Sequence, residues 1–253
     1  MQLPVNTFKH AILSGKHQLG FWVTLPGGTI AELLAGSGYD WLLFDTEHAP
    51  TDVLDVLEQM QAAAPYPVSA VIRPANNDAV LIKRLLDLGA QTLLIPYVQS
   101  RAEAEAAVSA MRYAPAGMRG VSGLTRATKY GRVADYARTA ASELCLLVQV
   151  ETALALERLE DIATVDGVDG IFIGPADLAA SMGHPGNSDH PDVVAAIADA
   201  IKRIRALGKP AGILTANPSY AQACIDQGTT FTAVGIDMHL LVTGADSLRK
   251  QFP

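Results

Sequence analysis

Hydrophobic positions along the chain form short continuous runs that alternate with longer segments of helical periodicity. Short apolar, β-branched runs are typical of strands that are buried on both faces, whereas apolar residues three and four positions apart are typical of helices that cover a sheet. We expect eight strands, at residues 19–24, 41–45, 68–72, 92–96, 144–150, 170–173, 211–215 and 231–236.

Amphipathic segments between these runs predict the covering helices. Clear examples lie at 52–60, 78–88 and 192–207. We expect Asp189 to cap the last of these and Pro191 to occupy its first turn. Strands that alternate with helices form a parallel sheet, and eight of them predict a closed (β/α)8 or TIM barrel of the α/β class. No linker-like stretch interrupts the series, so we expect one domain over residues 1–253.

Composition excludes several classes of protein. Of the 253 residues, 49% are hydrophobic and 18% are charged, which is typical of a globular chain with a large core. The net charge of −7 disfavours nucleic acid as a partner. No apolar run approaches the roughly 18 residues that span a bilayer, and residues 1–16 lack the apolar core of a secretory signal. Cys145 and Cys224 are too few for a disulfide framework, so we expect a cytoplasmic protein. Since no apolar run is long enough to span a bilayer, we also expect no membrane partner.

Ionisable residues gather at the carboxyl ends of the predicted strands. In a (β/α)8 barrel the loops that follow the strands meet at one mouth, where substrates bind. The relevant segments are Asp45-Thr46-Glu47-His48, Arg73-Pro74, Gln149-Val150-Glu151, Gly174-Pro175-Ala176-Asp177 and Ile236-Asp237. The sequence therefore predicts a site at this mouth.

Two carboxylates at the ends of neighbouring strands indicate a metal site. Glu151 and Asp177 are expected to approach a common point near the barrel axis. Close carboxylates repel each other unless they are protonated or bridged by a cation. Oxygen ligands with several open positions suit Mg²⁺ or Mn²⁺ together with a chelating substrate. The alternative is that either acid caps the helix after its strand.

Three further features suggest how a substrate is held. Arg73 ends an apolar strand, where its guanidinium needs an anion: a substrate carboxylate or enolate oxygen, or a structural partner in Asp45 or Glu47. His48 follows two acids and is a candidate general base, although a lone loop histidine is more often structural. Free amides of the helix that opens after Gly174 offer a place for a carboxylate.

The other histidines and the lysines suggest less. His184 and His190 lie six residues apart in the loop after the sixth strand, which is not helical ligand spacing, and we interpret them as part of a solvated loop without zinc. His10 and His17 are expected to flank the first helix. Only Lys129, in the insert after the fourth strand, has a position that leaves a Schiff base at the mouth open. A metal is therefore the expected electron sink for any carbon chemistry.

With these residues in place, the chain resembles the HpcH/HpaI aldolase family, and most closely its 4-hydroxy-2-oxoheptanedioate aldolases. The segments that show the resemblance span nearly the whole chain: 31–36, 41–50, 73–74, 85–98, 112–113, 115–117, 149–152, 167–178 and 212–214. The resemblance implies a class II pyruvate aldolase, a homohexamer whose last helix is exchanged between subunits. It also implies a divalent cation (Mg²⁺, Mn²⁺ or Co²⁺) without an organic cofactor, and pyruvate, aldehydes and 4-hydroxy-2-oxo acids as substrates.

Residue roles follow from the resemblance by position. Glu151 and Asp177 resemble the metal ligands, and Arg73 resembles the group that binds the pyruvyl oxygens and steadies the enolate. His48 resembles the acid/base histidine, with Asp45 beside it. The remaining matches are Gln149 as a polar neighbour of the metal, Gly174, Pro175, Ala176 and Asp177 as the loop that holds the substrate carboxylate, Trp22 and Leu214 on the aldehyde side, and Asp87 as an acid that reaches the histidine of a neighbouring subunit.

The chain departs from the family pattern near the mouth. Residues 25–28 replace a serine-rich stretch, and Thr46 stands where glycine is frequent. Both positions bear on the choice of aldehyde. The alternatives are a 2-dehydro-3-deoxy-glucarate-type sugar-acid aldolase, an enzyme for citramalyl-type CoA esters, which is disfavoured because no basic patch is present, and a non-catalytic barrel that binds 2-oxo acids.

Overall fold

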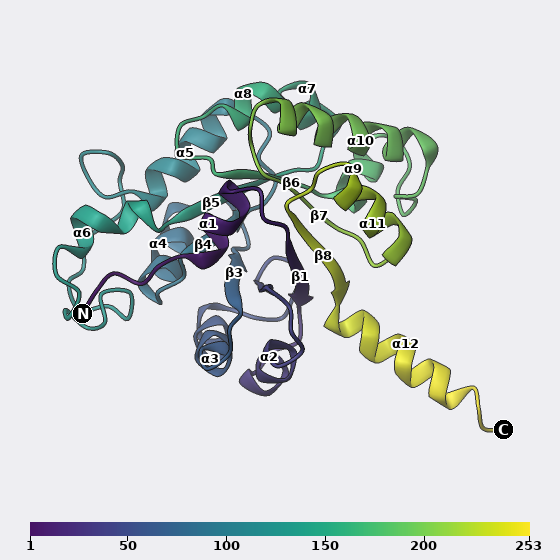
Figure 1. Ribbon diagram of the computed structural model, residues 1–253, viewed down its shortest axis with the longest axis horizontal. Helices are drawn as coiled ribbons and strands as arrows, with labels where there is room; N and C mark the ends of the chain where they lie inside the picture. The colour runs from purple at the N-terminus through teal and green to yellow at the C-terminus, as the bar shows by residue number, and fades with distance from the viewer.

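Eight parallel strands close into a barrel in sequence order in the computed structural model, which describes residues 1–253 (Figure 1). The strands are β1 Gln18–Val23, β2 Trp41–Asp45, β3 Ser69–Arg73, β4 Thr92–Ile95, β5 Cys145–Val150, β6 Gly170–Ile173, β7 Ala211–Leu214 and β8 Phe231–Ile236. The barrel closes where β1 pairs with β8, with Gln18 opposite Phe231. The predicted fold is confirmed, and no strand end differs from its predicted position by more than one residue.

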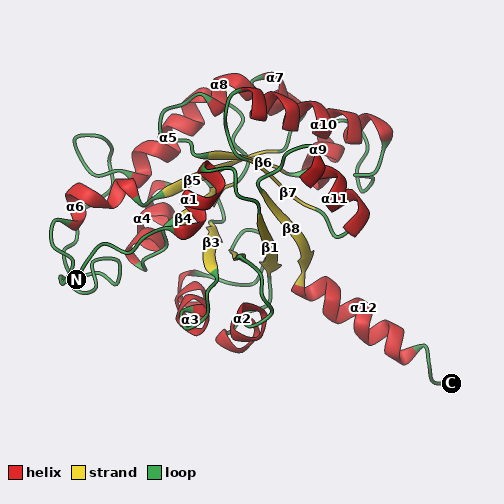
Figure 2. Cartoon of the chain, in the orientation of Figure 1, coloured by secondary structure: helices red, strands yellow, loops and turns green.

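Helices surround the barrel (Figure 2). They are α1 Thr7–Leu13, α2 Gly28–Ala35, α3 Val53–Ala63, α4 Ala79–Asp87, α5 Arg101–Met111, α6 Tyr136–Thr139, α7 Ala153–Glu157, α8 Leu159–Ala163, α9 Pro175–Ser181, α10 Pro191–Ala206, α11 Pro218–Asp226 and α12 Asp237–Arg249, with a 3₁₀ turn, η1, at Ala140–Ser142. No helix has the length and apolar composition needed to cross a bilayer.

The start of α10 differs from its prediction. Pro191 occupies the first turn as expected, but the residue that caps the helix is His190, and the prediction of Asp189 was wrong. The Nδ1 atom of His190 accepts a hydrogen bond from the amide of Asp192 at 3.2 Å. The reason is positional: a cap directly precedes the first helical residue, and proline fixes which residue that is.

Two apolar layers arise because successive strand residues point to opposite faces of the sheet. In β2, Trp41 and Leu43 belong to the cluster inside the barrel, whereas Leu42 and Phe44 pack in the larger cluster between the strands and the helices. Asp45 is the next residue in the inward series, at the carboxyl end of the strand. The alternation that builds the core therefore also aims polar side chains into the mouth.

Helix α1 closes the opposite end of the barrel with apolar side chains. Phe8 and Ile12 are fully buried there, and the ring of Phe8 lies 5.7 Å from that of Trp41 and 5.9 Å from that of Phe231. His10 lies within α1, not beside it as predicted. The amphipathic pattern of residues 7–13 places it on the outer side of the helix.

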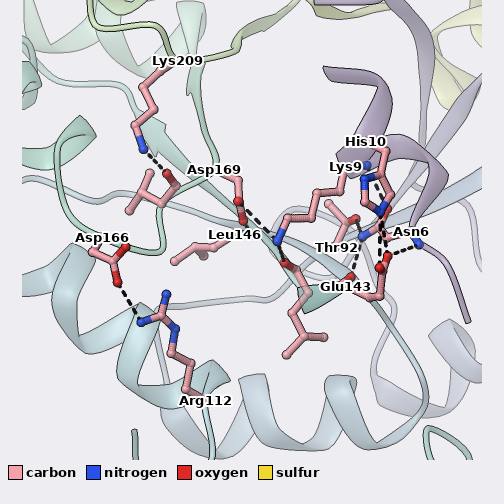
Figure 3. Close-up of polar contacts among 12 residues, drawn as sticks. Asn6, Lys9, His10, Thr92, Arg112, Glu143, Leu146, Asp166, Asp169 and Lys209 are labelled. Atoms are coloured by element: carbon pink, nitrogen blue, oxygen red, sulfur yellow. Dashed lines mark hydrogen bonds and ion pairs between the residues drawn. The ribbon is translucent and has the colours of Figure 1, made fainter. Parts of the chain in front are cut away.

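Polar contacts fasten the same end of the barrel (Figure 3). Lys9 Nζ donates to the carbonyl of Leu144 at 2.6 Å and lies 3.5 Å from a carboxylate oxygen of Asp169. Asn6 Nδ2 donates to Thr92 Oγ1 at 2.9 Å and to the carbonyl of Glu143 at 3.0 Å. Charged and polar groups at this end therefore have partners within the chain.

Candidate active site

A pocket of about 320 Å³ opens at the carboxyl ends of the strands. Its walls include these residues singled out from the sequence: Trp22, Asp45, His48, Arg73, Gln149, Gly174, Pro175, Ala176, Asp177 and Leu214. Ile236, from the predicted end of the last strand, also lines the pocket, as do Thr24, Phe172 and Met238, which were missed. Phe172 was detectable, because it lies two residues before Gly174 and therefore shares its inward face.

Arg73 lies at the centre of an ion-pair network in this pocket. Its Nε and Nη2 atoms donate to the two carboxylate oxygens of Asp45 at 2.8 and 2.6 Å, and its Nη1 atom lies 2.7 Å from Glu47 Oε2. The guanidinium also stacks on Trp22, 5.1 Å from the ring centroid. The structural ion pair considered from the sequence is thus present with both acids, and it fixes Arg73 against the pocket wall.

Asp45 is engaged in orienting its neighbours. Besides Arg73, it accepts hydrogen bonds from Trp22 Nε1 at 3.3 Å and from the amide of Glu47 at 3.0 Å. Burial raises the pKa of this carboxyl, but the hydrogen bonds and charge of Arg73 outweigh burial, and the net pKa is lowered. Asp45 is therefore an anion that holds Arg73, and it makes no hydrogen bond to His48.

Glu151 is 2% exposed and directly follows β5. Its Oε1 accepts the amide of Tyr97 at 2.8 Å, and its Oε2 accepts the side-chain amide of Gln149. Tyr97 has φ 55°, a left-handed conformation that is unusual for an aromatic residue and that marks a constrained turn after β4. Gly174 is required opposite, because a Cβ at that position would overlap Glu151.

Burial, and to a smaller degree neighbouring acids, disfavours the charged form of Glu151. Burial raises its pKa to about 7, with Asp177 and Glu47 adding to the rise and the Tyr97 amide opposing it. Burial also raises the pKa of Glu47. Asp45, Glu47 and Glu151 thus share a single arginine, and Asp177 adds its charge near the two glutamates. Hard oxygen donors with excess negative charge fit a divalent cation, which would favour their charged forms. Glu47, two residues beyond Asp45, was not predicted as a site residue.

The first turn of α9 faces the pocket. Gly174 is the N-cap and offers no side chain to the helix, and Pro175 fills the first position. The amides of Ala176 and Asp177 therefore have no intrahelical acceptor, and the helix dipole favours an anion there. This turn presents both a carboxylate and two free donors to the pocket.

His48, Asp87 and Lys129 lie farther from the buried carboxylates. The side chain of His48 is 67% exposed at the pocket rim, and its Nε2 lies 3.9 Å from Glu47 Oε2. Asp87 ends α4 and pairs with Arg119 at 2.8 Å, outside the pocket. Lys129 lines a separate pocket with Pro4, so this chain does not bring it to its own mouth.

Comparison with known proteins places the chain among related barrels. The family described as HpcH/HpaI aldolase/citrate lyase matches residues 18–244. A pyruvate aldolase of Rhizobium etli is 63% identical over 252 residues, which cover 100% of this chain and 99% of that protein. A 4-hydroxy-2-oxo-heptane-1,7-dioate aldolase of Klebsiella pneumoniae is 55% identical, with coverage of 98% and 94%. The solved structure of a family protein from Burkholderia cenocepacia has a TM-score of 0.94 at 36% identity, over 98% and 99% of the two chains.

Proposed function

Because the chain belongs to the HpcH/HpaI aldolase/citrate lyase family and is an aldehyde-lyase, we propose that it is a metal-dependent class II aldolase that reversibly cleaves 4-hydroxy-2-oxo acids to pyruvate and an aldehyde. With 4-hydroxy-2-oxoheptanedioate the aldehyde would be succinic semialdehyde. The observation that supports this most directly is the buried Glu151, whose pKa is raised to about 7 beside Asp177 and Glu47. A cluster of this kind is costly without a cation, and the reaction needs one.

Glu151 and Asp177 would hold the cation, with Mg²⁺, Mn²⁺ or Co²⁺ as the candidates. When bound, such an ion polarises the keto group of the substrate and stabilises the negative charge that develops there. Gln149 donates to Glu151 and keeps that carboxylate oriented. Tyr97 does the same through its backbone amide at 2.8 Å. The chain therefore fixes one ligand from two sides before any substrate arrives.

The chain's own residues supply the rest of the chemistry. The amides of Ala176 and Asp177 would bind the substrate carboxylate. Arg73, held rigidly by Asp45, would donate to the pyruvyl oxygen and stabilise the transition state more than the neutral ketone. His48 at the rim would accept the proton of the C4 hydroxyl as the C3–C4 bond breaks, directly or through a water. The electrons of that bond remain on the pyruvate fragment, which is then protonated.

Assembly as a homohexamer with an exchanged last helix belongs to the same proposal. Helix α12 projects away from the barrel (Figure 1), and within it only Asp237 is buried. Leu240, Leu241, Val242 and Leu248 are all more than half exposed. An apolar helix in water is costly, so a second copy of the chain is its expected partner. Asp87 would then act toward the His48 of that copy.

Metal replacement tests the proposal. We expect EDTA to abolish cleavage of 4-hydroxy-2-oxo acids and Mn²⁺, Co²⁺ or Mg²⁺ to restore it. A panel of aldehydes with pyruvate then separates succinic semialdehyde from neutral aldehydes and sugar-derived acceptors. Exchange of the pyruvate methyl protons, followed by NMR, distinguishes a catalyst from a barrel that only binds 2-oxo acids. Full activity in a metal-stripped sample would refute the mechanism.

A further inference from the structure

The loop between α9 and α10 brings together two histidines and a carboxylate, away from the mouth. The imidazoles of His184 and His190 are stacked, with centroids 3.5 Å apart and an interplanar angle of 14°. His184 Nε2 and His190 Nδ1 each lie 3.7 Å from Asp192 Oδ2. The three ligand-type atoms all lie within 4.8 Å of one another.

The loop backbone, and not helical periodicity, produces this cluster. Gly183 and Gly186 adopt φ 87° and 74°, left-handed conformations that turn the chain twice within the loop. The amide of His184 donates to the carbonyl of Ala179 at 2.8 Å, which anchors the loop to the end of α9. His184 and His190 do lie in a partly exposed loop, as predicted, but their six-residue spacing gave no sign that the loop would stack the two rings.

We propose that His184, His190 and Asp192 form a second cation site, selective for a borderline transition ion such as Zn²⁺ or Co²⁺. Two imidazole nitrogens and one carboxylate oxygen are a ligand set that these ions prefer, with water completing a tetrahedron. The Nδ1 atom of His190 is unprotonated, because it accepts the Asp192 amide at 3.2 Å, and an ion bound at this nitrogen would displace that hydrogen bond. The rings must splay from their stack so that both lone pairs, which lie in the ring planes, aim at one ion.

Accessibility favours binding from solution. The side chains of His184 and His190 are 26% and 32% exposed, and that of Asp192 is 71% exposed. An ion can therefore enter without unfolding the loop, while the half-buried rings are already partly ordered. None of the three residues lines the mouth pocket, so the site does not depend on the proposed aldolase chemistry.

Ligand hardness separates the two sites. The two ligands proposed at the mouth, Glu151 and Asp177, are carboxylates, which bind Mg²⁺ as well as transition ions, whereas imidazole discriminates against Mg²⁺. The tag-free, metal-free chain should therefore bind one equivalent of Mg²⁺ but two of Co²⁺ or Zn²⁺. An ion on His184 and Asp192 would also tie the α9–α10 loop to the first turn of α10.

Calorimetric titration with Mg²⁺ alone and with Co²⁺ alone tests the proposal, supported by the visible absorption of nitrogen-bound Co²⁺. We expect His184→Ala to weaken one Co²⁺ equivalent by at least ~10-fold, because loss of a direct ligand costs no less than loss of an outer-shell partner, and to leave Mg²⁺ binding unchanged. His190→Asn removes the imidazole while keeping a capping side chain for α10. His10→Gln, which alters an exposed histidine 3.1 Å from Glu143, is the matched control.

Each outcome is decisive for one site. Equal stoichiometry and equal affinity of both Co²⁺ equivalents in wild type and His184→Ala, with both proteins folded by circular dichroism, would overturn the second site. If the proposed function fails because the mouth binds no cation, the wild type would bind a single Co²⁺ that His184→Ala removes, and Glu151→Ala would not change it. A rise in melting temperature with Zn²⁺ in Glu151→Ala, absent in the double variant with His184→Ala, would support the loop site independently.

Discussion

The two ends of the barrel treat charge in opposite ways. At the closed end, Lys9 contacts Asp169 and the carbonyl of Leu144, and Asn6 makes hydrogen bonds to Thr92 and Glu143 (Figure 3). At the mouth, acids outnumber bases, and the pKa of Glu151 is raised to about 7. The polar groups named at the closed end are paired within the chain, although burial raises the pKa of Asp169 and the buried hydroxyl of Thr230 lacks a partner, whereas at the mouth several acids share one arginine. The first arrangement stabilises the fold, whereas the second leaves charge at the mouth that a bound ligand would neutralise.

This contrast yields a rule for assigning roles. A substitution at the closed end should lower the free energy of unfolding and leave the activity of the folded protein unchanged. Removal of a proposed metal ligand at the mouth should mainly lower activity, because it removes a ligand while it relieves repulsion; Asp45, which pairs with Arg73, is not in this group. Arg73 belongs to both categories, since it neutralises Asp45 and faces the pocket.

Asp177→Ala should give the largest effect. We expect the rate of aldol cleavage to fall by at least ~10³-fold, about 4 kcal/mol, because one of two cation ligands is lost. The melting temperature of the metal-free protein should change little, because the relief of repulsion around Glu151 offsets the loss of an acid from the first turn of α9. Asp161→Ala, an acid in the first turn of α8, is the matched control. Activity within tenfold of wild type would exclude Asp177 as a ligand.

Arg73→Ala should lose both stability and turnover. Asp45 is 1% exposed, and a buried carboxylate without its partner costs about 3 kcal/mol in the free energy of unfolding. Cleavage should slow by a similar free energy, because no donor meets the developing charge. The double variant Arg73→Met with Asp45→Asn separates the two effects: urea denaturation should recover, and cleavage should not. Recovery of both would remove Arg73 from the mechanism.

Glu151 should make the free energy of unfolding of the metal-free protein depend on pH, in a direction that follows from its raised pKa. Its pKa is raised from 4.5 to about 7 in the folded metal-free chain, so the native state binds more protons than the unfolded state within that window. The free energy of unfolding should therefore decrease as pH rises from about 4.5 to 7, by at most about 3 kcal/mol, and then level off.

Glu151→Gln isolates this contribution. The buried Oε1 of Gln149 lacks a partner, so that amide can rotate to accept from the new one. The difference between wild-type and Glu151→Gln unfolding curves, measured with EDTA from pH 4.5 to 8, should follow the predicted decline. In the wild type, saturating Mn²⁺ should abolish this decline in the free energy of unfolding with pH. It should not have this effect in Glu151→Gln. A pH-independent difference would show that Glu151 is not held at a raised pKa.

Features of the fold and site that follow from hydrophobic periodicity could be predicted from the sequence. The predicted strand ends placed Asp45, Arg73 and Gln149 at the mouth, and the mouth pocket contains all three. Features that depend on the backbone conformation of a loop could not be predicted. The left-handed Tyr97, which aims an amide at Glu151, and the paired His184 and His190 depend on turns that no apolar pattern encodes.

The N-cap of α10 and the position of α1 at the closed end of the barrel were also not predicted correctly from the sequence pattern. Asp189 has the side chain typical of a cap, but Pro191 sets the boundary one residue later. Helix α1 was placed only loosely, because its two buried residues, Phe8 and Ile12, fill the barrel end and not a groove on the sheet. Such packing is determined by tertiary contacts.

Asn6→Ala tests the closed end and should give the smallest effect. Asn6 is 4% exposed; its Oδ1 caps α1 by accepting the amide of Lys9 at 2.9 Å, and its Nδ2 donates to Thr92 and to the carbonyl of Glu143. Loss of a cap and of buried hydrogen bonds should cost about 2 kcal/mol in urea denaturation. Asn6→Asp keeps the cap but removes both donations, so it divides the cost between them. Turnover and Mn²⁺ affinity of the folded fraction should match wild type, and a loss in either would mean that the two ends are coupled through the barrel and do not act independently.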